Sequence, residues 1–342
     1  MIPKSTSPTI DDVAREAGVS ISTVSRVLNR NVPVSDKVAS KVEAAIRALR
    51  YTPRAAARNL ATSRTSTLGL LLAEIVGDFF SPLLRGVESV AREHGYDLLI
   101  STAGRRGPQK ELPGPFGKHN ADGLLVFAGS LTDEGVRDTY SFGVPMVLLH
   151  QSSPQDLTIP CVTIENKAAT RAIVEHLITK HNRRKILFLT GEPYNEDGYW
   201  REMGYREALA RHDLPIEPEL IAPGHFDRHI AQASIEQALR EKIQFDAVFA
   251  GDDEAAVGVY AALRAANLNI PRDVSVVGFD DQGLAQVLQP ALTTVHVPIE
   301  QVGIEAARCL IQLIQTGTAE PLTLLPTTLV IRSSCGCLEP SL

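Results

Sequence analysis

The sequence predicts an α/β protein that has a small all-α headpiece at its N-terminus and doubly wound parallel sheets behind it. Three observations lead to this prediction. Two short amphipathic helices flank Gly18, apolar runs alternate with amphipathic helices over residues 67–335, and charge is divided unevenly along the chain. With 342 residues, of which 44% are hydrophobic, the chain is long enough for two or three domains and a substantial core.

The headpiece is predicted to start with two helices and a tight turn. Thr9 followed by Asp12 has the pattern of a capping box, and apolar residues then repeat at helical spacing up to Ala17. Gly18 ends this helix and Ser20 is the next N-cap. A third helix, beginning at Ser35, is expected to pack across the pair. This order of elements is a helix-turn-helix arrangement.

The second helix carries an unusual number of short polar side chains on the side opposite its buried valines. That side presents Ile21, Ser22, Ser25, Arg26 and Asn29. Hydroxyl and amide groups of this size let a helix enter a DNA major groove, where Arg26 would make a bidentate contact to guanine and Ile21 would touch a thymine methyl. The alternative is a solvent-exposed helical hairpin, although solvated faces usually carry Glu and Lys.

The distribution of charge supports a nucleic-acid partner for the headpiece alone. Residues 1–66 hold eleven Lys and Arg against five acidic side chains, a net charge of +6. Because the whole chain carries −6, the remaining residues carry −12. A basic N-terminal segment followed by an acidic remainder is expected when only one end of a protein binds nucleic-acid phosphates.

A short segment after the third helix has two alternative interpretations. In residues 52–66 Pro53 suits a first helical turn, Arg54 and Arg58 would lie on one side of two helical turns, and Leu60 would be exposed. Such a segment would order only on DNA, with Leu60 wedged into a minor-groove step. The same composition fits a flexible interdomain linker.

Seven apolar runs in the body have the length and composition of strands. They are Leu68–Leu72, Asp97–Ile100, Gly123–Val126, Met146–Leu149, Ile186–Leu189, Ala247–Phe249 and Val274–Val277. Helices are predicted between them, at Pro82–Glu93, Ala168–Thr179, Arg201–Arg211, Ile230–Arg240 and Glu254–Ala266. This alternation predicts parallel sheets, and the number of strands favours two sheets over one.

Polar and aromatic residues gather where these strands end. Ligands of doubly wound sheets bind beyond the carboxyl ends of strands. The candidates there are Phe79, Phe80, His150, Asp197, Arg201, Asp252 and Asp280, with Phe226 in a turn between helices. Carboxylates, one guanidinium and aromatic faces suit a neutral polyol, and three carboxylates beside one arginine disfavour an anion. Tyr199 and Trp200 could add a further ring, whereas each polar candidate, Asp197 above all, could instead cap a helix.

The headpiece segments TIDDVAREAGVSISTVSRVLN and VSDKVASKVEAAIRALRYTPRAAARNLATSRT resemble those of the lactose-repressor (LacI/GalR) family. Segments of the body, among them FFSPLLRGVESVAREHGYDLLI, DAVFAGDDEAAVGVYAAL, PRDVSVVGFDD and the terminal SCGC, resemble the effector module of the same family, so the resemblance covers nearly the whole chain. Members of this family are homodimeric or tetrameric transcription regulators that bind palindromic operators and respond to small molecules.

The resemblance implies a division of the chain and roles for particular residues. It implies a helix-turn-helix headpiece at 1–51, a hinge at 52–66, and a periplasmic-binding-protein-like effector module at 67–342. Within that module, lobe 1 would comprise about 67–165 and 295–325, and lobe 2 about 166–294 and 326–338. Bases would be read by Ile21, Ser22 and Arg26; phosphates would be contacted by Thr9, Ser20, Thr23, Ser25, Asn29 and Tyr51; and Leu60 would intercalate. The eight candidate residues of the body coincide with the family's effector positions.

Three features depart from the family pattern. His150 replaces a common Asp, residues 104–120 form a Pro/Gly-rich stretch where relatives have an amphipathic helix beside the dimer interface, and Lys180-His181-Asn182 replaces a Leu-Gly-His turn. A tetramer-forming tail with leucine heptads is not present in the sequence, which favours a homodimer.

Catalytic, cofactor and metal motifs are not found in the sequence. It contains no G-x-G-x-x-G after a strand, P-loop, G-x-S-x-G elbow or H-E-x-x-H, so neither an enzyme nor a cofactor is expected. Cys335-Gly-Cys337 could be half of a metal site, but nine scattered histidines show no ligand spacing and a plain tail is favoured, so no metal is expected.

The expected function is therefore a sequence-specific DNA-binding regulator, specifically a repressor of sugar-utilisation genes. Its expected partners are double-stranded, pseudo-palindromic operator DNA, a neutral mono- or oligosaccharide bound between the lobes, and a second copy of the chain. With four scattered cysteines, no secretory h-region and no apolar run of about 20 residues, a cytoplasmic, nucleoid-associated location without a membrane partner is expected. The alternatives are a sugar-binding receptor without a transcriptional role and a sugar-processing enzyme.

Overall fold

The computed structural model describes residues 8–29, 34–51, 65–75, 79–103, 109–112, 116 and 120–338. Two compact units are present, Met1–Thr65 and Ser66–Leu342. We call them the headpiece and the body. The predicted fold class is confirmed: a helical headpiece precedes an α/β body that contains two parallel sheets.

Three helices form the headpiece: α1 (Ile10–Ala17), α2 (Ile21–Asn29) and α3 (Asp36–Leu49). The capping box predicted at the start of α1 is present, because the Thr9 hydroxyl accepts from the Asp12 backbone and the Asp12 carboxylate accepts from the Thr9 backbone. Gly18 closes α1 with a φ of 65°, in the left-handed region. Ser20 caps α2, since its Oγ accepts from the Thr23 backbone at 3.2 Å. The predicted turn chemistry is thus confirmed.

The first part of the body, which we call lobe 1, is built on a six-stranded sheet with the order β11-β5-β4-β3-β1-β2. Its strands are β1 (Thr67–Leu72), β2 (Asp97–Thr102), β3 (Gly123–Phe127), β4 (Met146–Leu149), β5 (Cys161–Ile164) and β11 (Leu322–Leu325), and all adjacent pairs are parallel. Its helices are α5 (Phe80–Glu93), α6 (Asp133–Ser141) and α12 (Ile299–Thr316).

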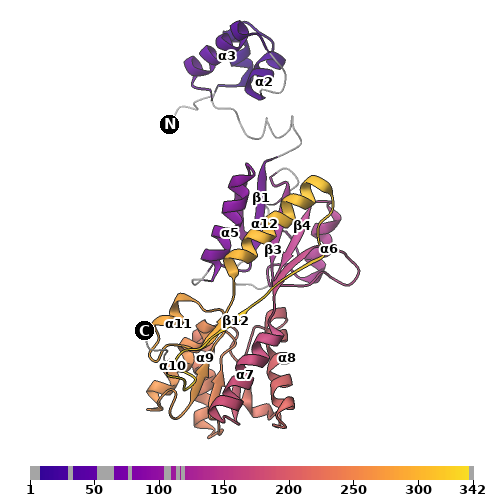
Figure 1. Cartoon of the computed structure of the whole chain (residues 1–342). Helices are drawn as coiled ribbons and strands as arrows, with labels where there is room; N and C mark the ends of the chain where they lie inside the picture. Colours follow the sequence, from indigo (N-terminus) through magenta and orange to yellow (C-terminus); the bar gives the residue numbers. More distant parts are fainter. Residues whose placement is uncertain are drawn as a thin grey trace, which may run out of the picture. The chain divides into compact units, whose positions relative to one another are not determined.

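The second part, lobe 2, is built on a four-stranded parallel sheet with the order β7-β6-β8-β9. Its strands are β6 (Ile186–Thr190), β7 (Ile221–Pro223), β8 (Ala247–Phe249) and β9 (Ser275–Val277). Its helices are α7 (Lys167–His181), α8 (Glu196–Arg211), α9 (Arg228–Arg240), α10 (Asp253–Ala265) and α11 (Gly283–Val287), together with the short 3-10 helix Pro218–Leu220. Figure 1 shows this second group of helices around its sheet, with β12 where the chain passes between the lobes.

The chain passes between the lobes three times. It leaves lobe 1 after β5 and enters α7, returns through β10 (Thr294–His296), and leaves again after β11 through β12 (Thr328–Val330). The strands β10 and β12 pair with each other in antiparallel register. Strands β5, β7, β10, β11 and β12 were not predicted. Short strands that were predicted, such as β4 and β8, are fully buried apolar runs, whereas β7, β11 and β12 contain no buried residue.

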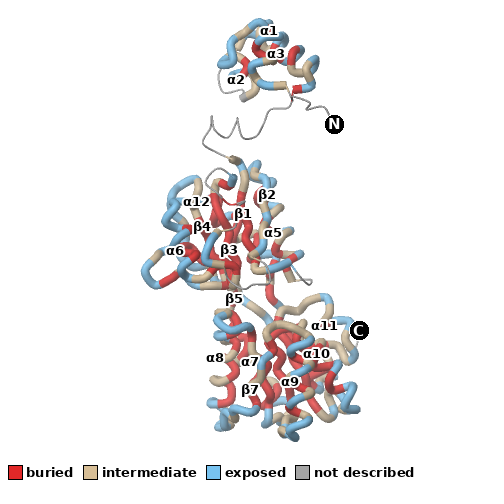
Figure 2. The backbone as a smooth tube through the Cα atoms, turned by 180° about the vertical axis from the view of Figure 1, so that it is seen from behind, coloured by how far each residue is buried: buried red, intermediate tan, exposed pale blue. Residues whose placement is uncertain are grey.

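The cores of both lobes follow the sheets, as the red segments of Figure 2 show. Four residues of β4 are all buried, and every residue of β3 is buried too. Fully buried strands of this kind are typical of parallel sheets covered on both faces. Within the Pro/Gly-rich stretch, the described residues form no helix; Phe116 is buried at 4% exposure and Gln109 bridges to Leu131. No helix among the described residues has the length and apolarity needed to cross a membrane.

We predict that replacing Gly303 by Ala destabilises lobe 1. Gly303 lies on α12 where α5 approaches, and a Cβ built there would lie 2.4 Å from the Leu83 carbonyl oxygen, which is backbone and cannot rotate away. The two helices would have to separate, at a cost of about 1–3 kcal/mol in the free energy of unfolding. Denaturant unfolding of the variant measures this cost. The control is Gly317→Ala at the C-cap of the same helix, where a Cβ meets open space but φ is 77°, so any loss there reflects backbone strain alone.

Candidate functional site

The side of α2 that carries short polar residues lies open on the headpiece surface. Ile21 is 47% exposed, and Ser20, Ser22 and Arg26 are exposed. Val24 on the opposite side is fully buried in the headpiece core, and Val27 and Leu28 are partly buried against it. Hydrophobic packing therefore fixes the orientation of α2 about its own axis and leaves the side that carries Arg26 exposed to solvent.

The hydroxyl groups at the start of α2 form a connected group. The Ser20 Oγ lies 2.8 Å from the Ser22 Oγ and 2.8 Å from the Thr23 Oγ1. Thr9, at the start of α1, is also exposed, whereas Thr23 and Ser25 are half-buried. Hydroxyls and backbone amides at two helix starts are the groups that proteins use to hold phosphates.

Tyr51 differs from the other predicted DNA contacts. It packs in the core of the headpiece and is only 8% exposed, so most of its ring supports the fold. Asn29 is the last residue of α2. The predicted contacts at Arg54, Arg58 and Leu60 lie outside the described residues.

In the body, Arg201 stands at the centre of a buried polar cluster. Its guanidinium donates to the Asn166 Oδ1 at 3.0 Å, to the Gly251 carbonyl at 2.7 Å and to the Asp280 Oδ1 at 3.1 Å. It also lies over the ring of Phe279, 3.8 Å from the ring centroid, and 5.4 Å from the centroid of Phe226. Since α8 begins at Glu196, Arg201 lies inside the helix, one turn from its start.

The same cluster reaches across to lobe 1 through His150, which follows β4. The His150 Nδ1 lies 2.7 Å from the Asp197 Oδ2, and Asn166 donates to the Asp197 Oδ1 at 2.7 Å. A second contact between the lobes is made by Ser152, whose hydroxyl donates to Glu196 at 2.6 Å. Asn166, at the crossing between β5 and α7, thus joins Asp197 to Arg201. No pattern in the sequence indicated this role of Asn166.

Aromatic rings form the lobe 1 side of the cluster. Phe79 packs edge-on against Phe80 at 5.3 Å and against His150 at 6.1 Å between ring centroids. Phe127, at the end of β3, completes the group with its ring 5.0 Å from that of His150. The structure therefore brings Phe79, Phe80 and His150 together. Phe226 lies in the turn after β7 rather than between two helices, and it faces Arg201 instead.

Helix capping explains the position of only some of the acidic candidate residues. The N-cap of α8 is Asn195, whose side chain accepts from the Gly198 backbone at 2.9 Å, so the prediction that Asp197 could be the cap is wrong. Asp252 does cap α10, since its carboxylate accepts from the Ala255 backbone at 2.8 Å. Asp253, which was not predicted, is fully buried and accepts from the Thr294 hydroxyl at 2.6 Å.

Burial and mutual charge set the pKa values of these carboxyls. Burial raises the pKa of Asp252 to about 8, and the nearby charge of Asp280 adds to this shift. Burial also raises the pKa of Asp280, although Arg201 opposes the shift. Burial acts the same way on Asp197, but the charge and hydrogen bond of His150, with Arg201 and Asn166, hold the pKa of Asp197 below its usual value. The site therefore retains charge at Asp197 and favours a proton on Asp252.

Two buried polar atoms beside the cluster have no hydrogen-bond partner within the described part of the chain: the His150 Nε2 and the Gln151 Nε2. Leaving a buried polar atom unpaired costs about 1–3 kcal/mol. In addition, His150, Phe226 and Asp280 have positive φ values of 57°, 56° and 104°. Strained backbone of this kind concentrates at functional sites. Both features are expected where a ligand supplies the missing contacts.

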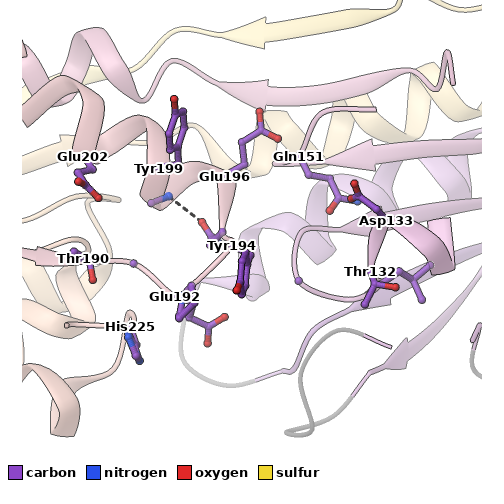
Figure 3. Close-up of a pocket in the computed structure, with 16 residues that line it drawn as sticks. Thr132, Asp133, Gln151, Thr190, Glu192, Tyr194, Glu196, Tyr199, Glu202 and His225 are labelled. Carbon is purple, nitrogen blue, oxygen red and sulfur yellow. Dashed lines mark hydrogen bonds between the residues drawn. The ribbon is translucent and has the colours of Figure 1, made fainter. Parts of the chain in front are cut away.

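Two clefts border the cluster. The larger, about 920 Å³, is shown in Figure 3; Thr132, Asp133 and Gln151 of lobe 1 face Glu192, Tyr194, Glu196 and Tyr199 of lobe 2. None of the eight predicted body residues lines it, although Gln151 and Glu196 adjoin His150 and Asp197 in sequence. The smaller cleft, about 670 Å³, is lined by Phe79 and Asp280 among others. Of the eight predicted residues, Phe79 and Asp280 are thus the ones that line either cleft.

The C-terminal cysteines have partners that the sequence analysis did not find. Cys335 and Cys337 lie beside His176 and His181 of α7. The expectation that these two cysteines lack ligand partners is therefore wrong. The sequence could not show these partners, because His181 of α7 lies 156 residues before Cys337 and only the fold brings the two segments together.

The chain thus combines a helix-turn-helix headpiece with a two-lobed body that holds a buried polar cluster. This combination is typical of ligand-responsive DNA-binding regulators. Two family models match the chain: the bacterial regulatory proteins of the lacI family over residues 9–54, and the periplasmic binding protein-like domain over residues 174–335. The chain is 34% identical to catabolite control protein A of Priestia megaterium over 318 residues, 91% of this chain and 94% of that protein.

Solved structures agree with these matches. The lac repressor dimer bound to operator and the anti-inducer ONPF superimposes with a TM-score of 0.80 at 27% identity, covering 96% of this chain and 99% of that one. A complex of the transcriptional regulator CelR with cellobiose superimposes with a TM-score of 0.70 at 29% identity, with the same coverage. The chain belongs to the lacI family of DNA-binding transcriptional regulators. This family is not enzymatic, as expected.

Proposed function

We propose that the protein is a homodimeric repressor of sugar-utilisation genes that is controlled by a small neutral sugar bound between lobes 1 and 2. The observation that carries this proposal is the buried cluster of His150, Asp197, Arg201 and Asp280, which joins the lobes and leaves the His150 Nε2 unpaired among the described residues. A regulator of operators would act in the cytoplasm, where the DNA lies.

The chemistry of the cluster favours a polyol over a charged effector. Asp197, Asp252 and Asp280 offer carboxyl oxygens to hydroxyl groups, Arg201 donates in a planar fork, and Phe79 and Phe226 offer flat apolar faces. A phosphate would need cationic donors, and the Arg201 guanidinium already donates to Asn166, Gly251 and Asp280. The cellobiose complex of a relative with the same fold supports this choice, as do the bordering clefts, which have the volume that small-molecule sites usually have.

A ligand screen tests the proposal directly. The full chain is heated with each of a panel of neutral mono- and disaccharides, and with the corresponding sugar phosphates as matched charged controls. We expect at least one neutral sugar to raise the melting temperature, and calorimetry should confirm one site per chain. If only the phosphates stabilise the protein, the assignment of a neutral effector is wrong.

The link between the two sites is a further part of the proposal. Two headpieces in a dimer would read two half-sites, and closure of the lobes on the effector would change the spacing of the two hinges. Allosteric coupling is typically about 1–3 kcal/mol, which is up to about a hundredfold in affinity. Operator binding measured with and without the sugar found in the screen gives the size and the sign of this coupling. A repressor released by its effector should bind the operator more weakly.

We predict that Arg26→Ala relaxes sequence preference at a single base position of each half-site. Arg26 is exposed on the side of α2 opposite the buried Val24, so the substitution leaves the headpiece core intact. A lost bidentate contact to guanine costs about 1–3 kcal/mol of discrimination. Binding-site selection with wild-type and variant protein measures it. Arg15→Ala on α1 is the matched control, and unchanged preference at every position in Arg26→Ala would remove this role.

A further inference from the structure

The C-terminal tail and the end of α7 bring four side chains of metal-binding types together. His176 and His181 come from α7, and Cys335 and Cys337 follow the crossing strand β12. One ligand atom from each residue lies within 4.8 Å of every other. Cys335 is buried and the other three are half-buried, so the group is enclosed without being sealed.

The distances among three of the four ligand atoms match a tetrahedral zinc site. Zinc binds imidazole nitrogen at about 2.0–2.1 Å and thiolate at about 2.3 Å, which places nitrogen about 3.4 Å from nitrogen and about 3.6 Å from sulfur in a tetrahedron. The His176 and His181 Nε2 atoms are 3.2 Å apart. The Cys337 Sγ lies 3.6 Å from the His176 Nε2 and 3.4 Å from the His181 Nε2.

Hydrogen bonds alone do not account for this arrangement. Each imidazole Nε2 offers either one hydrogen or one lone pair. The two Nε2 atoms and the Cys337 Sγ nevertheless all contact one another, so each Nε2 faces two partners. One cation at the centre would accept a lone pair from every atom of the group at once.

The surrounding residues fit the same interpretation. Gly336, between the two cysteines, has a φ of 113°, and a Cβ there would lie 2.9 Å from the His181 Nδ1. Glycine is thus required for the tail to turn both cysteines toward the imidazoles. The Thr293 Oγ1 lies 3.2 Å from the Cys335 Sγ, close enough to donate to a thiolate, and such outer contacts are typical of metal sites.

We propose that His176, His181, Cys335 and Cys337 bind one structural Zn²⁺. A set of two nitrogens and two sulfurs in tetrahedral spacing favours zinc over Mg²⁺ or Ca²⁺, which prefer oxygen ligands. Four protein ligands leave no open position for a substrate, so the ion is structural rather than catalytic. Binding converts both thiols to thiolates and releases two protons to solvent.

The ion would fasten two crossings between the lobes to each other. The tail that holds Cys335 and Cys337 follows β12, and α7 follows β5 and begins next to Asn166, a member of the effector cluster. A zinc ion bound at the C-terminal end of α7 would therefore fix the position of this helix, and Asn166 lies at its N-terminus. The proposal does not depend on the identity of the effector.

Metal content and cobalt spectroscopy test the site in the untagged full-length protein. We expect about one zinc per chain after purification without chelator. Cobalt added to metal-free protein should give the visible bands of tetrahedral coordination and a thiolate-to-cobalt charge-transfer band. Zinc returned to metal-free protein should raise the melting temperature by at least about 5 °C.

Variants localise the ion. Cys337→Ser and His176→Gln should each lower zinc affinity by at least about a hundredfold, since even outer contacts are worth ten- to a hundredfold. Cys309→Ala, which alters a cysteine of α12 outside the group, should bind zinc like the wild type. Wild-type protein that takes up neither zinc nor cobalt overturns the proposal, and so does equal zinc loss in Cys309→Ala and Cys337→Ser. The wild-type titration decides the question even if a variant fails to fold.

Discussion

Arg201→Ala should abolish the response to effector and destabilise the body, while operator binding without effector persists. The guanidinium is almost completely buried, and its removal leaves the Asp280 carboxylate, the Asn166 Oδ1 and the Gly251 carbonyl without their donor. Removing one member of a buried ion pair costs about 3–5 kcal/mol. We expect a loss of this size in the free energy of unfolding, measured by denaturant titration.

The effect on the effector should be equally large. Truncating a buried charged partner typically costs about 2–5 kcal/mol in binding, which is at least about thirtyfold in affinity. Calorimetry with the sugar identified in the screen measures it. Because the headpiece is a separate compact unit, its affinity for DNA in the absence of sugar should not change.

A matched control lies on the same helix. Arg206 pairs with Glu202 within α8, where both side chains are partly exposed, so Arg206→Ala removes an arginine and an ion pair without opening the cluster. Exposed pairs of this kind contribute at most about 1 kcal/mol. If Arg201→Ala binds sugar as tightly as Arg206→Ala does, Arg201 is not an effector contact.

The fold could be predicted from the sequence because its signals are local. The Thr9–Asp12 capping box, the Gly18 turn and the apolar run of β3 each depend on neighbouring residues, and all three are present in the structure. Three of the strands that were missed, β7, β11 and β12, contain no buried residue, so their local signals are weak. β11 is half-exposed and pairs with β5, so neither its apolar content nor its length distinguishes it from a loop.

The candidate site was predictable only in part for the same reason. Residues that follow strands, such as His150 and Asp280, could be singled out because parallel strands end at a common edge. Asn166 could not, since an asparagine before a helix is usually a cap and its contacts with Asp197 and Arg201 arise only from packing. The pairing of His176 and His181 with the terminal cysteines is likewise a product of the fold.

Asp252→Asn should make the protein more stable at alkaline pH and flatten the dependence of its stability on pH. Burial raises the pKa of Asp252 to about 8 in the folded protein, while an unfolded chain has an ordinary aspartate with a pKa near 3.8. Between about pH 4 and pH 8 the folded state holds a proton that the unfolded state has released. Unfolding therefore releases a proton, and rising pH favours it.

The contribution of this carboxyl is thus fully present below about pH 4 and is lost as the pH rises through about 8. Each unit of pKa shift corresponds to about 1.4 kcal/mol. Burial also raises the pKa of Asp253 well above its usual value and raises that of Asp280, so these carboxyls share the slope. The difference between Asp252→Asn and the wild type isolates the part that Asp252 contributes. Asparagine keeps the cap on α10, because its side-chain oxygen can still accept from the Ala255 backbone, and it removes the charge that repels Asp280.

Asp227→Asn provides the control, because Asp227 caps α9 through the His229 and Ile230 backbones but lies at the surface. Free energies of unfolding measured across the pH range should run parallel for Asp227→Asn and the wild type, and diverge for Asp252→Asn as the pH rises.

If Asp252 also contacts the effector, the stabilised variant should bind sugar less tightly. Stability and binding would then change in opposite directions, as expected when a fold retains a strained, charged cluster for its ligand. If the stabilities of Asp252→Asn and the wild type run parallel between about pH 4 and pH 8, Asp252 is ionised in the folded state.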